Sequence, residues 1–391
     1  MSSVAETLRE LVAISSVSRE SNRGIISFAQ RVLTRAGWSF AEYPYLDPAG
    51  IEKINLIAWP SESPLENQEV ELALVCHTDT VPFAPEWANA TRLMADGDDL
   101  NGCGACDVKG FLACILAVAS EIDTKRLAKP VGIILTADEE IGCVGIRHLA
   151  EQQVLSPRFA IVGEPTSLEP IRAGKGYCLA ELVVTGREAH SAFPERGASA
   201  ILRAAKLIVE IEKLAERLKE FRADGFSPSY TSINIGEIHG GLAKNIVPPS
   251  CRFLLEWRPI AGQDPELVPR LVGSAIRELT QSDAGFRCDF KVLRMQEGFS
   301  LGDDSPLVRA LASASGAAPG SVAFGTEAPW LGKMGAEAVV FGPGSMQSAH
   351  SPREFVPRAE LSACVEILKT VIYDLCGSPQ AGAISPASSQ E

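Results

Sequence analysis

Three largely apolar runs in the first half of the chain have the length of a β-strand, and acidic or imidazole side chains directly follow each run. The runs and the polar residues behind them are Leu72–Cys76 with His77 and Asp79, 130–137 with Asp138, Glu139 and Glu140, and 159–163 with Glu164. Unbroken apolar runs of this length indicate strands that are buried on both faces of a largely parallel sheet. Such sheets bind ligands outside the carboxyl ends of their strands, so we expect the polar residues there to form a site.

Helical periodicity separates these strands. Apolar residues spaced three and four apart predict amphipathic helices over 4–12 and 25–36, and an almost wholly apolar helix follows Asp107. Further helices are predicted over 305–314 and 359–375. Strands that alternate with helices predict an α/β domain whose parallel or mixed sheet is covered on both faces.

The pattern changes near residue 177 to the alternation that is typical of antiparallel strands. The elements predicted there are a strand at 177–185, a helix at 198–221, strands at 230–237 and 251–258, a helix at 264–280 and a strand at 286–293. This is the element order of a ferredoxin-like α+β domain. We therefore predict an insertion at 180–293 within a domain made of 1–179 and 294–376. The Ser/Pro/Ala/Gly-rich segment 377–391 is predicted to be a disordered tail.

Composition narrows the function classes. The chain of 391 residues is 46% apolar, enough for a full core, and its net charge of −13 argues against nucleic-acid binding. The N-terminal residues show no signal peptide, and no apolar run reaches the length of a membrane span. We expect a cytoplasmic protein.

The chain contains ten cysteines, which we interpret as reduced thiols of an intracellular protein. Cys103 and Cys106 form a C-x-x-C motif. A structural zinc site would need a second such pair nearby, and none follows at the usual spacing. A redox motif remains an alternative for these two residues.

Asp107 and His350 belong to the same residue types as the polar residues that follow the strands, namely carboxylates and imidazoles. Singly, each has a simpler interpretation: a capping Asp in a turn, an Asp at a helix start, or a solvated pair of acids. Together, like charges that converge on one crevice repel, and a metal cation relieves that repulsion. Two imidazoles with several carboxylates suit zinc or a similar divalent ion. Glu139 and Glu140 are adjacent and face opposite ways on a strand, so one can bind metal while the other acts as a general base.

Several motifs extend this pattern across the chain. They are His77-Thr-Asp79-Thr-Val-Pro, Gly104-Ala-Cys-Asp107-Val-Lys-Gly110, Thr136-Ala-Asp-Glu139-Glu140, Val162-Gly-Glu164-Pro-Thr, Gly186-Arg-Glu-Ala-His190-Ser, Phe324-Gly-Thr-Glu327-Ala and Gly342-Pro-Gly-Ser-Met-Gln-Ser-Ala-His350. In this order they resemble the M20 metallopeptidase family. The resemblance implies a zinc-peptidase-like three-layer catalytic domain, with the insertion as a dimerisation lid, and two divalent metal ions, zinc or cobalt.

The resemblance also implies a role for each residue at the metals. Asp107 would bridge both ions, His77 and Glu164 would complete one site, Glu140 and His350 would complete the other, Asp79 would orient His77, and Glu139 would be the general base. Two features depart from the family pattern. Cys103 and Cys106 stand where relatives more often have small or hydroxyl residues, and Glu256 stands where an Asp is usual.

Residues of the insertion are implicated by the resemblance as well. His190 would reach into the site of a second subunit and stabilise the oxyanion, which implies a homodimer; without the family, Ala189-His190-Ser191 is simply a turn before a helix. Asn245 and Arg258 resemble contacts to a substrate carboxylate, although an Arg is often part of a surface ion pair. Glu327, which follows the insertion, could meet a substrate amine.

The activity implied is hydrolysis of N2-acetyl-L-ornithine to L-ornithine and acetate, a step of arginine biosynthesis. The alternatives are other amide hydrolases of the family: a desuccinylase, an acetylcitrulline deacetylase, an aminoacylase or a dipeptidase. The stretch 324–328 favours the acetylornithine branch, because desuccinylase relatives carry a Ser/Asp-containing turn there. A catalytically silent binding protein would have lost a ligand or the base, and all of these residues are present.

Overall fold

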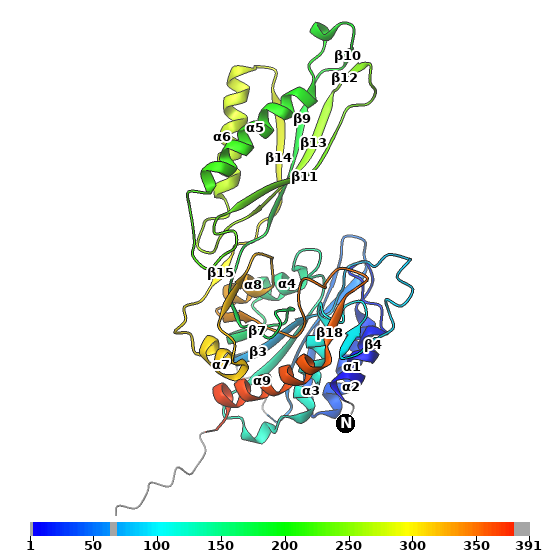
Figure 1. Cartoon of the computed structure of the whole chain (residues 1–391), viewed down its shortest axis with the longest axis vertical. Coiled ribbons are helices and arrows are strands. Elements are labelled where there is room, and N and C mark those ends of the chain that lie inside the picture. The colour runs from blue at the N-terminus through cyan, green and yellow to red at the C-terminus, as the bar shows by residue number, and fades with distance from the viewer. Residues whose placement is uncertain (1–2, 63–68, 379–391) are drawn as a thin grey trace, which may run out of the picture. The chain divides into compact units, whose positions relative to one another are not determined.

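The computed structural model describes residues 3–62 and 69–378, which divide into two compact units (Figure 1). Unit 1 comprises Met1–Pro170, Asp303–Pro319 and Trp330–Glu391, and unit 2 comprises Ile171–Gly302 and Gly320–Pro329. The main part of unit 2 thus runs from 171 to 302, where the sequence pattern predicts 180 to 293, and unit 2 also takes in 320–329, which that pattern assigns to the other domain. From residue 379 onward, the predicted tail at 377–391 lies outside the described residues.

The sheet of unit 1 is mixed. Its strands, in spatial order, are β1 (Trp38–Leu46), β2 (Glu52–Pro60), β6 (Val131–Thr136), β3 (Glu69–His77), β7 (Ser156–Val162) and β17 (Glu337–Val340). The last four strands run parallel to one another, whereas β1 pairs with β2, and β2 with β6, in antiparallel fashion. Every residue of β6 is buried, as expected for a strand covered on both faces. The α/β class predicted from the alternating pattern is confirmed.

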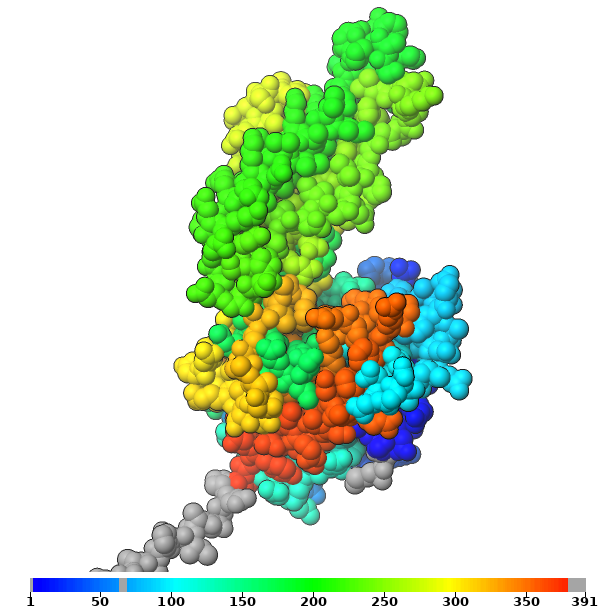
Figure 2. Space-filling view, in the orientation of Figure 1, coloured from blue at the N-terminus to red at the C-terminus, as the bar shows by residue number. Residues whose placement is uncertain are grey.

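Helices of unit 1 pack on this sheet and on one another; α3 and α9 contact β3, while α2 and α4 contact β2. The helices are α1 (Val4–Val12), α2 (Arg23–Arg35), α3 (Lys109–Glu121), the 3-10 helix η1 (Thr124–Arg126), α4 (Val144–Gln152), α7 (Pro306–Ser315), α8 (Ala328–Lys333, which begins in unit 2) and α9 (Arg358–Cys376). A small antiparallel sheet joins β4 (Met94–Asp96), β5 (Asp99–Asn101) and β18 (Phe355–Pro357). Its cyan and orange segments lie side by side in Figure 2. Among the described residues, no helix is long and apolar enough to cross a membrane.

Unit 2 has the ferredoxin-like order that the sequence pattern predicts. Its main elements are β9 (Cys178–Thr185), α5 (Ala200–Leu218), β11 (Ser232–Gly240), β13 (Ser250–Arg258), α6 (Leu267–Ser282) and β14 (Arg287–Arg294). The four strands form one antiparallel sheet in the order β11-β13-β9-β14. Short elements complete the unit: β8 (Ile171–Gly174), β10 (Ala189–His190), η2 (Pro194–Arg196), β12 (Ile246–Val247), β15 (Phe299–Ser300) and β16 (Gly320–Val322).

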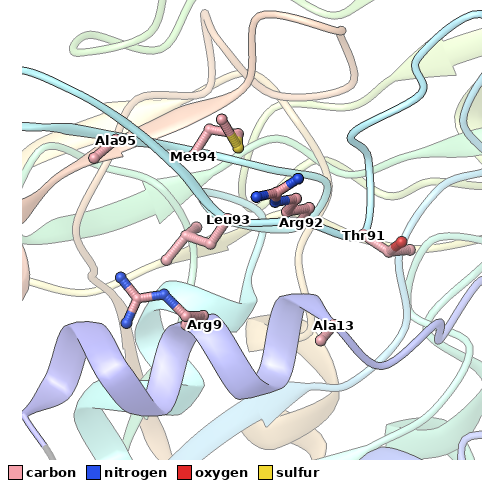
Figure 3. Close-up of a pocket in the computed structure, with 7 residues that line it drawn as sticks. All are labelled: Arg9, Ala13, Thr91, Arg92, Leu93, Met94 and Ala95. Atoms are coloured by element: carbon pink, nitrogen blue, oxygen red, sulfur yellow. The ribbon is translucent and has the colours of Figure 1, made fainter.

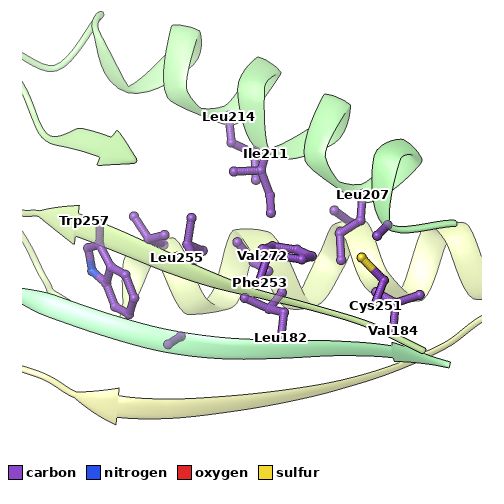
Figure 4. Packing of buried hydrophobic residues seen from close by; sticks show 14 of the residues in the cluster. Leu182, Val184, Leu207, Ile211, Leu214, Cys251, Phe253, Leu255, Trp257 and Val272 are labelled. Atoms are coloured by element: carbon purple, nitrogen blue, oxygen red, sulfur yellow. The ribbon is translucent and has the colours of Figure 1, made fainter. Parts of the chain in front are cut away.

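Alternation builds the core of unit 2. Along β13, buried Phe253, Leu255 and Trp257 alternate with less buried residues, so one face of the sheet is apolar. Leu207, Ile211 and other apolar residues of α5, together with Val272 of α6, pack on that face (Figure 4).

Replacing Phe253 with alanine is expected to destabilise unit 2 by about 3–5 kcal/mol, because the wholly buried ring would leave a cavity that its neighbours fill only in part. Urea unfolding measures the change. Leu254→Ala, on the opposite face of the same strand, is the control and should cost less, because that side chain is only half-buried. Equal losses for the two variants would contradict this picture of the core.

Candidate metal centre

Candidate ligands meet in unit 1 because β3 runs parallel to both β6 and β7, so the carboxyl ends of these strands are neighbours. His77 is the last residue of β3, and the other residues come from segments that follow β6 and β7 or precede α3 and β18. They form two groups, and within each group the ligand atoms all lie within 4.8 Å of one another. The groups are His77, Glu139 and Glu164, and Asp107, Glu140 and His350.

Asp107 joins the two groups. Its Oδ1 lies 3.1 Å from Nε2 of His77, and its Oδ2 lies 3.2 Å from Nε2 of His350. His350 Nε2 also lies 3.2 Å from Oε2 of Glu140. The N-cap of α3 is Val108, so the Asp107 carboxylate does not cap that helix. One carboxylate with an oxygen toward each imidazole has the arrangement that a bridge between two metal ions requires.

Asp79 contacts His77 through its backbone carbonyl and not, as expected, through its carboxylate. His77 Nδ1 lies 3.1 Å from the backbone carbonyl of Asp79 and 3.7 Å from its carboxylate. With the proton on Nδ1, His77 donates to that carbonyl and offers Nε2 as a ligand. The Asp79 carboxylate instead accepts the backbone N–H groups of Glu139 and Glu140, at 3.0 and 3.3 Å, and the hydroxyl of Ser18 at 2.8 Å. It therefore holds the backbone of the acidic pair.

Burial and mutual repulsion dominate the electrostatics of the acids. Burial raises the pKa of Glu164 well above its usual range, and the charges of Asp107 and Glu139 add to this. Burial likewise raises the pKa of Glu139 to about 7; the nearby His77 lowers it, and Glu140 and the other acids raise it. Asp107 is the exception. Burial raises its pKa, but hydrogen bonds from His350 and His77 outweigh burial and hold the pKa below the usual range.

The imidazoles respond in the opposite sense. Burial lowers the pKa of His77, but the hydrogen bond to Asp107 and the surrounding carboxylates raise it well above its usual value. Hydrogen bonds to Asp107 and Glu140 raise the pKa of His350 to about 10. The site therefore attracts positive charge, and its imidazole and carboxylate donors fit zinc or a similar divalent cation. Bound cations would take the place of these protons.

Glu354 also contributes to the site, although the residues around it in the sequence give no indication of this role. This carboxylate is buried and accepts the backbone N–H groups of Cys106 and Asp107, at 2.9 and 3.0 Å. Its own backbone N–H donates to Ser351, in the loop that carries His350. Glu354 thus ties the Asp107 segment to the His350 segment.

The C-x-x-C thiols do not take part in either ligand group. Both are buried and free, and burial raises the pKa of Cys103 to about 11 and that of Cys106 further. Thiols with such values stay protonated at neutral pH and react slowly as nucleophiles. The structure therefore gives the redox interpretation of this motif no support.

The other expected residues lie in unit 2. His190 is exposed on β10 and its Nδ1 accepts the backbone N–H of Ala192; the next residue, Ser191, donates to the Asn245 carbonyl. The structure therefore brings the segments of His190 and Asn245 together.

Arg258 and Glu327 are held within unit 2 in different ways. Arg258 pairs with Glu256 at 2.8 Å, donates to the Ala323 carbonyl and lies over the ring of Tyr177. Its guanidinium thus already takes part in the ion pair that the simpler interpretation expects. Glu327 is only 1% exposed.

A separate hollow of about 400 Å³ lies between α1 and the segment before β5 (Figure 3). Its lining residues are Arg9, Ala13, Thr91, Arg92, Leu93, Met94 and Ala95. None of the candidate ligands lies in this lining, and both arginines are solvent-exposed.

A family model for Peptidase family M20/M25/M40 matches residues 73–374, which include both ligand groups. The chain belongs to the M20 family. It is 45% identical over 372 residues to an acetylornithine deacetylase of Myxococcus xanthus, covering 95% of this chain and 97% of the relative. An acetylornithine deacetylase of Aliivibrio fischeri is 34% identical over 328 residues, covering 83% and 85% of the two chains. The chain is thus a metallohydrolase of the M20 family.

Solved structures share the M20 fold with this chain. A tripeptidase of Staphylococcus aureus matches with a TM-score of 0.74 at 23% identity, covering 95% of this chain and 97% of its own. The Bacillus subtilis YXEP protein, described as a dinuclear metal-binding peptidase of the M20 family, matches with a TM-score of 0.67 at 14% identity, covering 95% and 97%. At these identities the likeness shows the fold alone.

Proposed function

We propose that this M20-family enzyme hydrolyses the acetyl amide of N2-acetyl-L-ornithine to L-ornithine and acetate, as a step of arginine biosynthesis. The observation that carries the proposal is that Asp107 joins two groups of candidate ligands, one of which contains Glu139. The near full-length similarity to two acetylornithine deacetylases supports the choice of substrate. The ten cysteines, which we interpret as reduced thiols, suit a reducing compartment, so we also propose a cytoplasmic location.

Two divalent metal ions, zinc or cobalt, are proposed as cofactors. Asp107 would bridge them, His77 and Glu164 would complete one site, and Glu140 and His350 the other. When bound, such ions lower the pKa of water and polarise a carbonyl group. The buried carboxylates of both groups support this assignment, because cations would offset their mutual repulsion.

Glu139 is proposed to move the proton. It takes a proton from the attacking water and later delivers it to the departing N2 amine, which makes it base and then acid. The Cys143 thiol donates to Glu139 Oε1 at 3.2 Å, and the backbone N–H of Glu139 is held by Asp79. These bonds orient the carboxylate. Asp79 also supports His77 through its backbone carbonyl.

Unit 2 is proposed to be a dimerisation lid, with His190 of one subunit steadying the oxyanion in the site of the other. Support comes from the exposed apolar side chains of this unit. They include Phe193, Ile201, Leu202, Ile238 and Leu242. Ile201 packs against Gly240 at the end of β11, and β11 is an edge strand with one unpaired side. Apolar residues beside an open edge favour association with a second copy.

Substrate contacts are proposed for three residues of unit 2. The Arg258 guanidinium would bind the substrate carboxylate together with the Asn245 amide, because an Arg fork matches a carboxylate. Glu327 would pair with the side-chain amine of ornithine. At 1% exposure, Glu327 reaches a substrate only if the segment at 323–327 opens.

A hydrolysis assay that detects the newly freed amino group, run on a panel of acylated amino acids and dipeptides, tests the proposal. We expect turnover of N2-acetyl-L-ornithine, loss of turnover after chelation and recovery with zinc or cobalt. Preference for succinyl-diaminopimelate, acetylcitrulline, another acyl amino acid or a dipeptide would instead identify one of the other family activities. A metal-loaded protein with no turnover of any of them would refute an enzymatic role.

Replacing His190 with alanine is expected to lower kcat by about 10²-fold, the loss typical of one oxyanion donor, without changing metal content. His190 belongs to neither ligand group, so metal binding should be unaffected. Glu278→Ala, an exposed residue of α6 in the same unit, is the control and should leave kcat unchanged. Unchanged turnover of His190→Ala would contradict the lid role.

A further inference from the structure

The turn between β6 and α4 carries Glu139 and Glu140, and its backbone is held in an unusual shape. Asp138 has a φ of 57° and Cys143 a φ of 53°, both in the left-handed region that non-glycine residues seldom adopt. Glu139 O accepts the N–H groups of Gly142 and Cys143, both at 2.9 Å. A turn of this kind persists only where its surroundings hold it in place.

Strand β2 supplies much of that support. Asn55 accepts the Ala137 N–H and donates to the Gly145 carbonyl, both at 3.1 Å, so it closes the turn at its two ends. Lys53, two residues earlier and on the same side of β2, lies 2.9 Å from Oδ1 of Asp138. Both partners of this ion pair are 1% exposed.

Lys53 also contacts a second segment that leads to the same turn. Its ammonium group donates to the carbonyls of Ser18 and Glu20. The buried ammonium group thus makes two hydrogen bonds to backbone carbonyls and one ion pair with Asp138. Ser18 in turn donates its hydroxyl to Asp79, whose carboxylate binds the N–H groups of the acidic pair. Lys53 therefore reaches the turn along two routes, one through Asp138 and one through Ser18 and Asp79.

We propose that Lys53 is a positioning residue that fixes the turn carrying Glu139 and Glu140. It belongs to neither ligand group; it acts through Asp138, whose other oxygen accepts the Tyr45 hydroxyl at 2.8 Å, and through Ser18. This role rests on the proposed function insofar as Glu139 is the base and Glu140 a ligand. If Lys53 had no positioning role, its buried ion pair would contribute to the stability of the fold alone.

The test separates positioning from folding by removing the ion pair in two ways. Lys53→Met leaves Asp138 buried without its cation, so this variant should be less stable. The double variant Lys53→Met/Asp138→Asn removes both charges and retains an acceptor for Tyr45, so its thermal midpoint should lie well above that of Lys53→Met. Any remaining loss relative to wild type comes from the Ser18 and Glu20 carbonyls, which lose their donor in both variants. Lys129→Met, which removes an exposed ion pair with Glu71 at the opposite end of β3 and β6, is the matched control.

The readouts are kcat, KM and zinc affinity by competition with a chelator. We expect the double variant to keep a reduced kcat, by about 10- to 100-fold, since small displacements of a reacting group have effects of that size. KM should stay near wild type, and zinc at the Glu140 group should be held more weakly. Lys129→Met should match wild type in all three.

Two outcomes would overturn the role of Lys53. One is a double variant whose kcat recovers together with its thermal midpoint; the other is unchanged zinc affinity and kcat in both variants. If the wild-type chain turns over no acylated amino acid, the proposed function fails instead. Lys53 is then judged on zinc affinity alone, and an unchanged affinity refutes it.

Discussion

Replacing Glu139 with glutamine is expected to lower kcat for acetate release by about 10²- to 10⁴-fold, the usual contribution of a general acid–base residue. Glutamine keeps the size of the side chain and an oxygen that accepts the Cys143 thiol. It cannot take a proton from water or return one to the leaving amine. Steady-state kinetics and metal analysis on the same preparation measure the effect.

Metal content decides what the loss of rate means. Geometry alone admits Glu139 as a third ligand beside His77 and Glu164, because their ligand atoms share one group. In the base role, Glu139→Gln keeps both metal ions. The matched control is Glu164→Gln, the same change in the same group, which should lose metal as well as rate. Loss of an ion from Glu139→Gln would count against the base assignment.

The meeting of the candidate ligands at the strand ends could be predicted from the sequence, because parallel strands place their carboxyl ends at the same edge of a sheet. Apolar runs buried on both faces become neighbouring parallel strands, and the residues that follow them must share one edge. That rule brings His77 close to the acids after β6 and β7. The strands of the inserted unit could be predicted equally well, because the alternation along β9 and β13 indicates strands with one buried face.

The role of Asp79 shows where such rules stop. On a strand, residues two apart point the same way, which predicts the carboxylate behind His77. β3 ends at His77, however, so the alternation no longer applies to Asp79. Its carboxylate turns to the N–H groups of Glu139 and Glu140 instead. The sequence pattern also predicts no strand over β1, which contains Pro44 and lies at the edge of the sheet, where a proline is tolerated.

Supporting residues were the hardest to predict. Glu354 accepts the backbone N–H groups of Cys106 and Asp107, which lie 248 and 247 positions earlier in the chain. Lys53 donates to the backbone carbonyls of Ser18 and Glu20. Backbone groups are the same at every position, so no residue pattern marks such partners. The ligands could be found because their chemistry is rare in buried positions, whereas their supports require the fold itself.

Replacing Asp107 with asparagine is expected to weaken both metal sites at once, and more than the roughly 10- to 100-fold that loss of an outer partner costs. Each oxygen of Asp107 faces a different imidazole, so one change removes a charge from both groups. Equilibrium dialysis with zinc should show fewer than two tightly bound ions per chain. Asp96→Asn, exposed on β4, is the control and should bind as wild type does.

Thermal unfolding provides an independent measure of the same bridge. Metal that binds only the folded chain stabilises it by about 2.7 kcal/mol at a hundredfold excess over Kd, so zinc should raise the midpoint of the wild-type protein. Asp107→Asn should lose most of that shift, because neither group keeps its full charge. Glu164→Gln, which alters one group, should retain part of it. Two tightly bound ions and a full thermal shift in Asp107→Asn would show that the groups bind metal independently, without a bridge.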